Sequence, residues 1–361
     1  MSATTPALDL ASSSIDLTQV ICDIESVSGN ETALADAIER ALHGHAHLDV
    51  FRDGDAIVAT TNLGRAQRVV IAGHIDTVPV NNNLPTRVDQ NADGSWLVGR
   101  GTVDMKAGVA VALKLAAELT EPAYDITWIW YDHEEVQASL NGLGRLARVR
   151  PDLLAGDFAI LMEPSNSIVE GGCNGTIRVD VIATGVRSHS ARSWMGENAI
   201  HKLSAALDTL ATYEPQTVTV DGLDYREGLN AVGISGGIAG NVIPDHAVIS
   251  VNYRFAPDKN PEQALAALRS LFAGYEVTVT DQASGARPGL DAVIAQDFVA
   301  AVGVPAAPKY GWTDVARFAE LGIPAVNFGP GDPSLAHMDD ERVLCSQITD
   351  AENALRTWLS A

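Results

Sequence analysis

Val69-Val-Ile-Ala-Gly-His74-Ile-Asp76 is a run of apolar residues that stops at a histidine and an aspartate. A short apolar run rich in β-branched residues is typical of a strand that is buried on both faces of a sheet. Two similar runs follow, at Ile126–Tyr131 and Phe158–Met162, and an Ala- and Leu-rich stretch from Lys106 to about Leu119 predicts a helix before them. This alternation predicts an α/β fold with a mainly parallel sheet flanked by helices.

The pattern of the chain changes between residues 176 and 286. Strands are expected at Thr176–Thr184, Gln216–Val220, Ala231–Gly237, Ala247–Phe255 and Tyr275–Thr280, and helices at Asn198–Tyr213 and Pro261–Phe272. Elements of this number and length suit a compact α+β sandwich, and α/β character resumes after Gly285–Gly289. We therefore predict that residues 176–286 are an inserted domain, while residues 1–175 and 287–361 form one discontinuous domain.

The composition narrows the class of partner. The 361 residues include 46 acidic and 24 basic side chains, which gives a net charge of −22. Such a surface repels nucleic acid and anionic membranes, so a small-molecule partner is expected. No segment has the ~18 apolar residues of a membrane helix or the pattern of a signal peptide, which predicts a cytoplasmic protein. Cys22, Cys173 and Cys345 are widely spaced, so neither disulfides nor a thiolate zinc site is expected.

Acidic and histidine side chains cluster where predicted strands end or a helix begins. They are His74, Asp76, Asp104, Glu134, Glu135, Glu163 and His337. Taken singly, each has a structural explanation, such as Asp104 capping the helix that follows it. Adjacent acids after a buried strand, however, resist desolvation unless a cation offsets the cost. Together these side chains would meet in one crevice, because open α/β sheets place their sites beyond the carboxyl ends of the strands.

The ligand chemistry of this set predicts two zinc ions. The two imidazoles of His74 and His337 and three carboxylates suit ions about 3.5–4 Å apart, with one histidine on each ion and a shared aspartate. Cobalt or manganese could occupy the same ligands. Glu134 would act as the general base on an attacking water, and Asp76 would orient the imidazole of His74. The chemistry that this arrangement predicts is hydrolysis of an amide bond.

Five motifs in this order and spacing resemble the zinc aminoacylase and carboxypeptidase family. They are His74-Ile-Asp76, Gly101-Thr-Val-Asp104-Met-Lys-Ala-Gly108, Glu134-Glu135, Glu163-Pro164 and the late His337. The resemblance covers nearly the whole chain and implies a catalytic zinc-binding domain with an inserted lid and dimerisation domain. It also implies that Asp104 bridges the two metals. By the same resemblance His74 and Glu163 hold one ion, and Glu135 and His337 hold the other.

The resemblance also implies roles for residues of the inserted domain. His189 matches a histidine that reaches the active site of the partner subunit to stabilise the oxyanion, so a homodimer is expected. Substrate contacts are expected from Arg187, Arg192, Asn241, Arg254 and Thr313. Guanidinium groups suit a substrate that carries several carboxylates, because each binds a carboxylate through two hydrogen bonds. Where many members of the family have paired arginines, this chain has Cys173-Asn174, which leaves the contact with a distal carboxylate open.

Two alternatives to an acyl-amino-acid hydrolase of this substrate class stay open. One is a different deacylase or a dipeptidase of the same family. The other is a catalytically silent binding or structural module on the same scaffold. Glu134 argues against the silent module, because a binding site has no need of a base.

Overall fold

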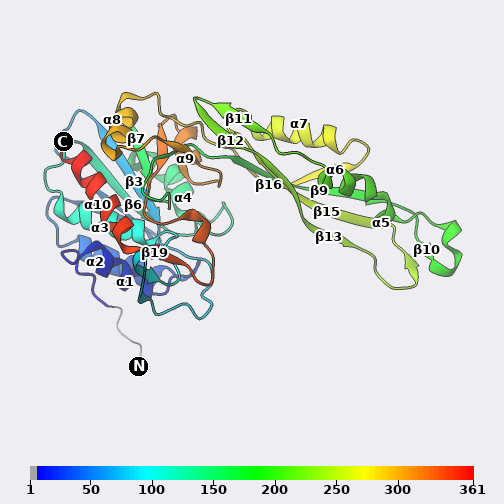
Figure 1. The fold of residues 1–361 in the computed structure, drawn as a ribbon, viewed down its shortest axis with the longest axis horizontal. Coiled ribbons are helices and arrows are strands. Elements are labelled where there is room, and N and C mark those ends of the chain that lie inside the picture. The colour runs from blue at the N-terminus through cyan, green and yellow to red at the C-terminus, as the bar shows by residue number, and fades with distance from the viewer. Residues whose placement is uncertain (1–5) are drawn as a thin grey trace. The chain divides into compact units, whose positions relative to one another are not determined.

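The computed structural model describes residues 6–361, which form two compact units (Figure 1). The first unit comprises the chain up to Gly171, together with Gly289–Ala307 and Thr313–Ala361. The second unit comprises Gly172–Pro288 and Pro308–Trp312. The insertion expected at residues 176–286 lies inside the second unit, which also includes the short segment 308–312.

An eight-stranded sheet forms the centre of the first unit. Its strands run in the order β1 (Asp49–Asp53), β2 (Ala56–Thr60), β6 (Asp125–Tyr131), β3 (Arg68–His74), β7 (Phe158–Leu161), β18 (Ala325–Asn327), β8 (Glu170–Gly171) and β17 (Ala307–Pro308). The neighbours β6, β3, β7 and β18 are parallel, whereas β2 and β8 pair with them in the antiparallel direction. The fold is therefore α/β, with a mixed sheet that is parallel at its centre.

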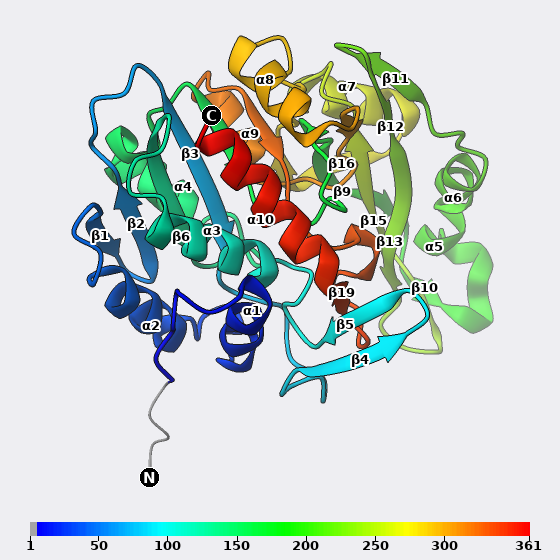
Figure 2. The same ribbon diagram turned by 60° about the vertical axis from the view of Figure 1, so that its left-hand side comes forward.

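Helices cover both faces of this sheet. α1 (Ser14–Asp23), α3 (Lys106–Glu118) and α10 (Cys345–Leu359) pack together on one face, and α4 (Gly142–Val149) and α9 (Val315–Glu320) lie on the other (Figure 1, Figure 2). α2 (Thr32–Leu42) packs on β1 and β2, and α8 (Val293–Val302) packs on α10. This cover explains the continuous apolar runs, because all seven residues of β6 are buried.

Smaller elements complete the first unit. β19 (Arg342–Leu344), β5 (Gly94–Val98) and β4 (Arg87–Asn91) form a three-stranded antiparallel sheet. Two short 3₁₀ helices, η1 (Pro151–Leu154) and η3 (Pro333–Leu335), lie in the connecting segments. The sheet of β19, β5 and β4 matters for the site, because its strands adjoin the turn before α3.

The second unit is built on a four-stranded antiparallel sheet in the order β13 (Gly228–Gly236), β15 (His246–Phe255), β9 (Gly175–Thr184) and β16 (Glu276–Ala283). Helices α5 (Ala199–Lys202), α6 (Ser204–Ala211) and α7 (Pro261–Leu271) share one core with it. Alternate residues of β9 and β15 are buried, as expected for a sheet with one covered face. Two small sheets, β11 (Thr217–Val220) with β12 (Leu223–Arg226) and β10 (Ser188–His189) with β14 (Val242–Ile243), and the 3₁₀ helix η2 (Ser190–Met195) complete the unit.

Two details differ from the expectations drawn from the sequence. The single helix expected over residues 198–213 is divided into α5 and α6, because the N–H of Leu203 bonds to the carbonyl of Ile200, only three residues back. Asp104 does not cap α3, since Met105 is the N-cap and no side chain of the described residues bonds to that first turn. The three cysteines are buried, and no disulfide joins them. Within residues 6–361, no helix has the length and apolar character needed to cross a membrane.

Candidate metal centre and active site

The segments that carry the predicted ligands leave neighbouring strands at one edge of the central sheet. His74 is the last residue of β3, Glu134 and Glu135 follow β6, and Glu163 follows β7. His337 follows β18, just beyond the short helix η3. Because β3, β6, β7 and β18 run parallel, their carboxyl ends share this edge.

Asp104 lies between the two predicted histidine ligands. Its Oδ1 is 3.1 Å from Nε2 of His74, and its Oδ2 is 3.2 Å from Nε2 of His337. Oε1 of Glu135 is 3.0 Å from the same nitrogen of His337. The ligand atoms of His74, Asp104 and Glu135 all lie within 4.8 Å of one another, close enough to bind a single cation. Four of the five predicted ligands, all except Glu163, are thus linked by contacts that run through Asp104 and His337.

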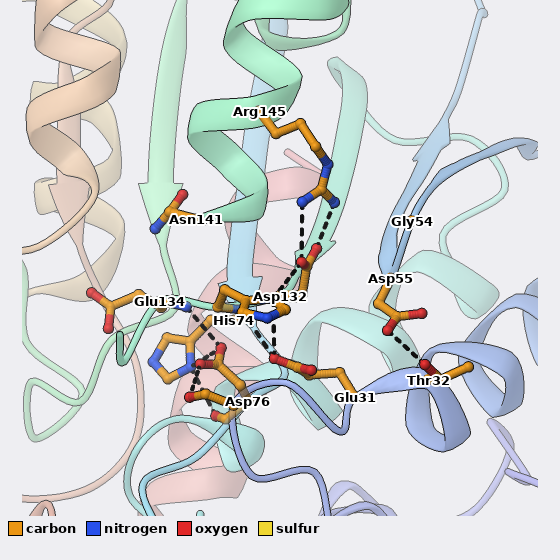
Figure 3. A network of polar contacts seen from close by, with 12 residues as sticks. Glu31, Thr32, Gly54, Asp55, His74, Asp76, Asp132, Glu134, Asn141 and Arg145 are labelled. Carbon is orange, nitrogen blue, oxygen red and sulfur yellow. Dashed lines mark hydrogen bonds and ion pairs between the residues drawn. The ribbon is translucent and has the colours of Figure 1, made fainter. Parts of the chain in front are cut away.

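Asp76 connects His74 to the two glutamates that follow β6 (Figure 3). Nδ1 of His74 donates to the backbone carbonyl of Asp76 at 3.0 Å, and the Asp76 carboxylate lies 3.5 Å from the same nitrogen. The two carboxylate oxygens accept the backbone N–H groups of Glu134 and Glu135 at 3.0 and 3.1 Å. Burial opposes ionisation, but the contacts with His74 and Ser28 and the Glu134 N–H lower the pKa of Asp76 to about 2. One ionised side chain therefore orients three residues of the site.

The electrostatics of this cluster favour positive charge. Hydrogen bonds to Asp104 and Glu135 raise the pKa of His337 to about 10. Burial disfavours a charged His74, yet its hydrogen bonds to Asp104 and Asp76 raise its pKa well above the ordinary value. Against the effect of burial, the two histidines hold the pKa of Asp104 well below its usual range. Clustered carboxylates beside imidazoles bind cations, and metal ions compete with protons for such groups.

Glu134 stands apart from the ligand contacts. Figure 3 shows its side chain extending away from Asp76 and Asp132. Among residues 6–361, no hydrogen bond engages its carboxylate. Burial raises the pKa of Glu134 well above its ordinary value; the His74 imidazole opposes this shift, and nearby carboxylates, Glu163 among them, add to it. A carboxyl group with a raised pKa and free oxygens is suited to take up a proton and release it again.

A second layer of polar residues, which no sequence pattern indicated, fixes the turn that leads into Glu134. His133 has a positive φ of 59°, and its Nδ1 lies 2.7 Å from Asp132 Oδ2. Its backbone N–H donates to Glu31 at 3.2 Å, 102 positions away in the chain. Arg145 clamps Asp132 with two hydrogen bonds of 2.7 and 3.1 Å (Figure 3). His133 is therefore held by Glu31 and Asp132, neither of which is a candidate ligand.

Most of the residues predicted to bind substrate lie in the second unit. His189 is exposed on β10, and its Nδ1 accepts the N–H of Ala191 at 3.0 Å. The carbonyl of Asn241, which is also exposed, accepts the N–H of Ser190 at 2.9 Å, so Asn241 lies beside the His189 segment. Arg187 forms an ion pair with Asp245 at 2.9 Å.

The remaining three predicted contacts differ in their surroundings. Arg192 is exposed in η2. Arg254 is half-buried on β15, where burial and then the nearby Arg178 lower its pKa. No described residue forms a hydrogen bond or an ion pair with the Arg254 guanidinium. Thr313 belongs to the first unit, is buried, and its hydroxyl donates to Oδ1 of Asn327 at 2.8 Å.

A parallel sheet whose carboxyl edge gathers nitrogen and oxygen ligands beside an uncoordinated carboxyl group defines a metal-dependent hydrolase. Residues 70–361 match the peptidase family M20/M25/M40, and the chain belongs to this family. The resemblance drawn from the five motifs is confirmed by this match.

Relatives and a solved structure agree with the assignment. The putative succinyl-diaminopimelate desuccinylase DapE of Mycobacterium tuberculosis is 52% identical over 355 residues, covering 98% of this chain and 99% of that protein. The succinyl-diaminopimelate desuccinylase of Corynebacterium glutamicum is 47% identical over 366 residues, with 98% of each chain covered. A tripeptidase of Staphylococcus aureus has a TM-score of 0.77 at 19% identity, covering 98% of this chain and 99% of that one. This last likeness shows the fold alone.

Proposed function

We propose that this protein hydrolyses N-succinyl-L,L-diaminopimelate to succinate and L,L-diaminopimelate, a step towards lysine and cell-wall precursors. The observation that carries the proposal is the identity of 52% and 47%, over nearly the full length, to proteins named as succinyl-diaminopimelate desuccinylases. Another deacylase or a dipeptidase of the same family is the second candidate, because the whole family shares this fold. The silent module is disfavoured by Glu134 and its raised pKa.

Two zinc ions are the cofactor that best suits the donor set. We infer that His74 and Glu163 hold one ion and Glu135 and His337 the other, with Asp104 between them. The support is the placement of Asp104, whose two oxygens face different imidazoles at 3.1 and 3.2 Å. Imidazole nitrogens and carboxylate oxygens are ligands that zinc takes, and cobalt or manganese fit them as well. When bound, such ions polarise a carbonyl and lower the pKa of water.

Glu134 is the residue that moves the proton in this proposal. The Asp76 carboxylate accepts the backbone N–H of Glu134 at 3.0 Å. The side-chain carboxylate of Glu134 accepts a proton from the attacking water. As the amide C–N bond breaks, the same carboxyl group delivers that proton to the leaving nitrogen, so succinate and a free amine result. The raised pKa helps the first transfer, because a stronger base takes the proton from water more readily.

Arg254 is the best-supported partner for a carboxylate of the substrate. It is half-buried, its pKa is lowered mainly by burial, and it has no ion-pair partner among residues 6–361. A desolvated guanidinium without a carboxylate gains most from binding one. Arg187 would first have to leave Asp245, and Thr313 would have to leave Asn327. Arg192 and Asn241 are exposed and complete the proposed set.

The edge strand β13 supports the proposal of a homodimer. Its side chains Val232 and Ile234 are 60% and 59% exposed, and Ile238, just beyond it, is 67% exposed. A long apolar edge strand is a template for pairing with another chain, and two-fold pairing of β13 with itself would join two sheets. His189 would then serve the partner's active site. Its Nδ1 already accepts the Ala191 N–H, which leaves an Nε2–H to donate to an oxyanion.

The test of the substrate is a comparison of N-succinyl-L,L-diaminopimelate with N-acetylornithine on the purified, zinc-loaded chain. We expect kcat/KM to favour the succinyl substrate by at least about 100-fold, because it carries two more carboxylates than N-acetylornithine and Arg254 is available to bind a carboxylate. Preference for acetylornithine would overturn the substrate assignment. Absence of turnover of every acyl amino acid and dipeptide tried would favour the silent module.

The test of the cofactor is removal and return of zinc. A chelator should abolish turnover, and two equivalents of zinc should restore it. Turnover that persists in the chelator would contradict the metal assignment, whatever the substrate proves to be.

A further inference from the structure

Arg100 and Glu341 form a buried ion pair behind the candidate metal centre. Their side chains are 4% and 1% exposed, and Nη1 of Arg100 donates to Oε2 of Glu341 at 2.8 Å. Neither residue is a candidate ligand, and neither takes part in the proposed proton transfers. Charges buried this deeply are costly unless further hydrogen bonds satisfy them, so the remaining partners indicate what the pair does.

Glu341 joins two of the segments that carry ligands. Its second oxygen, Oε1, accepts the backbone N–H groups of Val103 and Asp104 at 2.9 and 3.1 Å. Its backbone carbonyl accepts the N–H of Gly99 at 2.8 Å. Glu341 lies on the segment that follows His337. The segment that carries His337 therefore holds both ends of the turn from Gly99 to Asp104, which presents Asp104 to the site.

Arg100 adds a third segment to this arrangement. Its Nη1 also donates to the carbonyl of Met338 at 3.3 Å, and its Nε donates to the carbonyl of Pro79 at 3.2 Å. Met338 directly follows His337, and Pro79 lies in the loop that follows His74. The guanidinium and its carboxylate partner thus connect the loops that carry His74, Asp104 and His337.

We propose that Arg100 and Glu341 are a positioning pair that sets the affinity of the ion assigned to Asp104, Glu135 and His337. The inference rests on the proposed function, because it uses the ligand assignment made there. Two of the three ligands of that ion, Asp104 and His337, lie on the segments that Glu341 joins. Of the ligands assigned to the other ion, Asp104 lies on these segments too, whereas the loop of His74 is reached only by the contact of Arg100 with Pro79, well beyond His74 in the chain. The pair acts through these ligands and contacts neither the substrate nor the metal.

Glu341→Gln tests the proposal, with Glu227→Gln as the matched control. Glu227 is likewise buried and accepts a backbone N–H, that of Ala256 at 2.9 Å, and it pairs with a cation, Lys259. It lies in the second unit and belongs to no ligand segment. In Glu341→Gln the new amide N–H₂ meets the guanidinium of Arg100, so one of the two contacts has to be lost.

The measurement is competition for Zn²⁺ between the zinc-loaded full-length chain and a chromophoric chelator. In Glu341→Gln we expect the affinity for one ion, the one assigned to Asp104, Glu135 and His337, to fall about 10–100-fold, the usual effect of removing an outer-shell partner. The other ion should be held nearly as in the parent. The kcat should fall and recover in excess Zn²⁺, while KM stays close to that of the parent. Glu227→Gln should match the parent in each of these measurements.

Parent-like affinity for both ions in Glu341→Gln would overturn the proposal. So would an equal loss in Glu227→Gln, which would show a general effect of removing a buried charge. If Glu341→Gln does not fold, Arg100→Lys decides by the same criterion, because lysine keeps the charge but cannot donate to Glu341, Met338 and Pro79 together. A parent that binds two zinc ions but ignores the succinyl substrate defeats the proposed substrate and leaves this inference to be judged by the affinities. A parent that binds fewer than two zinc ions defeats the two-ion assignment and this inference with it, whatever its substrate.

Discussion

The central strand β6 of the first unit and the edge strand β13 of the second lie in opposite environments. All seven residues of β6 are buried, whereas every residue of β13 from Asn230 to Gly236 is exposed. A strand held on both faces fixes the position of the residues that follow it, here Glu134 and Glu135. A strand with a free edge is available to another chain. The buried strand of the first unit thus positions Glu134 and Glu135, whereas the second unit has an edge strand that is open to pairing.

The largest expected effect separates chemistry from metal binding at the end of β6. Glu134→Gln keeps the size of the side chain and the backbone contact with Asp76, but it cannot accept a proton. We expect kcat to fall about 10²–10⁴-fold, with the bound zinc retained. Steady-state kinetics together with metal analysis measure both quantities. Loss of zinc along with turnover would make Glu134 a ligand and not a base.

The next effect tests the free edge of β13. Ile234→Lys places a charge in the apolar edge, so we expect a monomer in analytical ultracentrifugation. If His189 acts across the interface, kcat should fall by about 10²–10³, as when an oxyanion donor is lost. Thr278→Lys on β16, the opposite edge of the sheet, is the control and should change neither. A fully active dimer of Ile234→Lys would place the interface elsewhere.

The loss of unfolding free energy on truncating a side chain should be larger in the buried strand β6 than in an exposed strand. Ile126, at the start of β6, is fully buried, so Ile126→Ala should lower the free energy of unfolding by about 2–5 kcal/mol. Val88 on β4 is 49% exposed, and Val88→Ala should change the free energy of unfolding by no more than about 0.5 kcal/mol. Urea denaturation measures both. Equal effects of the two substitutions would contradict the assigned burial of β6.

The smallest effect depends on pH and concerns Asp125, which begins β6. Its carboxylate accepts the N–H groups of Leu63 and Arg65 at 2.7 and 2.9 Å, and despite burial these bonds lower its pKa. Because the folded pKa lies below the unfolded value of about 3.9, the stabilisation is complete above that value and is lost as the pH falls through the folded pKa.

Asp125→Asn should therefore cost about 1–2 kcal/mol of unfolding free energy at pH 7. The difference from the parent should shrink as the pH falls below about 4. Urea denaturation at a series of pH values follows this change. A difference that grows on acidification would reverse the assigned sign.

The same contrast explains which elements could be predicted from the sequence. β3, β6 and β7 were predicted to within two residues, because burial on both faces requires continuous apolar runs. β4 was not predicted, since Arg87–Asn91 is exposed throughout and its sequence shows no regular alternation of apolar and polar residues. β10 and β14 are two residues long, too short for any pattern. The fold class is confirmed, while the homodimer and the cytoplasmic location stay predictions.

Residues of the candidate site were predictable only where chemistry and position coincide. His74, Glu135 and Glu163 follow recognisable strands and are of types that bind metals. Glu31 and Glu341 were missed, because each acts on backbone groups far away in the chain: Glu341 is 237 positions from Asp104. A lone glutamate gives no local sign of such a contact, which exists only once the sheet has brought the loops together.

The Asp76 carboxylate accepts hydrogen bonds from two successive backbone N–H groups, those of Glu134 and Glu135. Because both backbone N–H groups bond to the same carboxylate, we expect Glu134 and Glu135, the proposed proton acceptor and the proposed ligand, to move together when the loop after β6 shifts. Variation of the inserted unit towards other acyl groups is therefore compatible with this spacing, provided that His189, the proposed oxyanion donor, is kept. Libraries that vary the second unit and leave Asp76 and His189 intact are the natural starting point for redesigned deacylases.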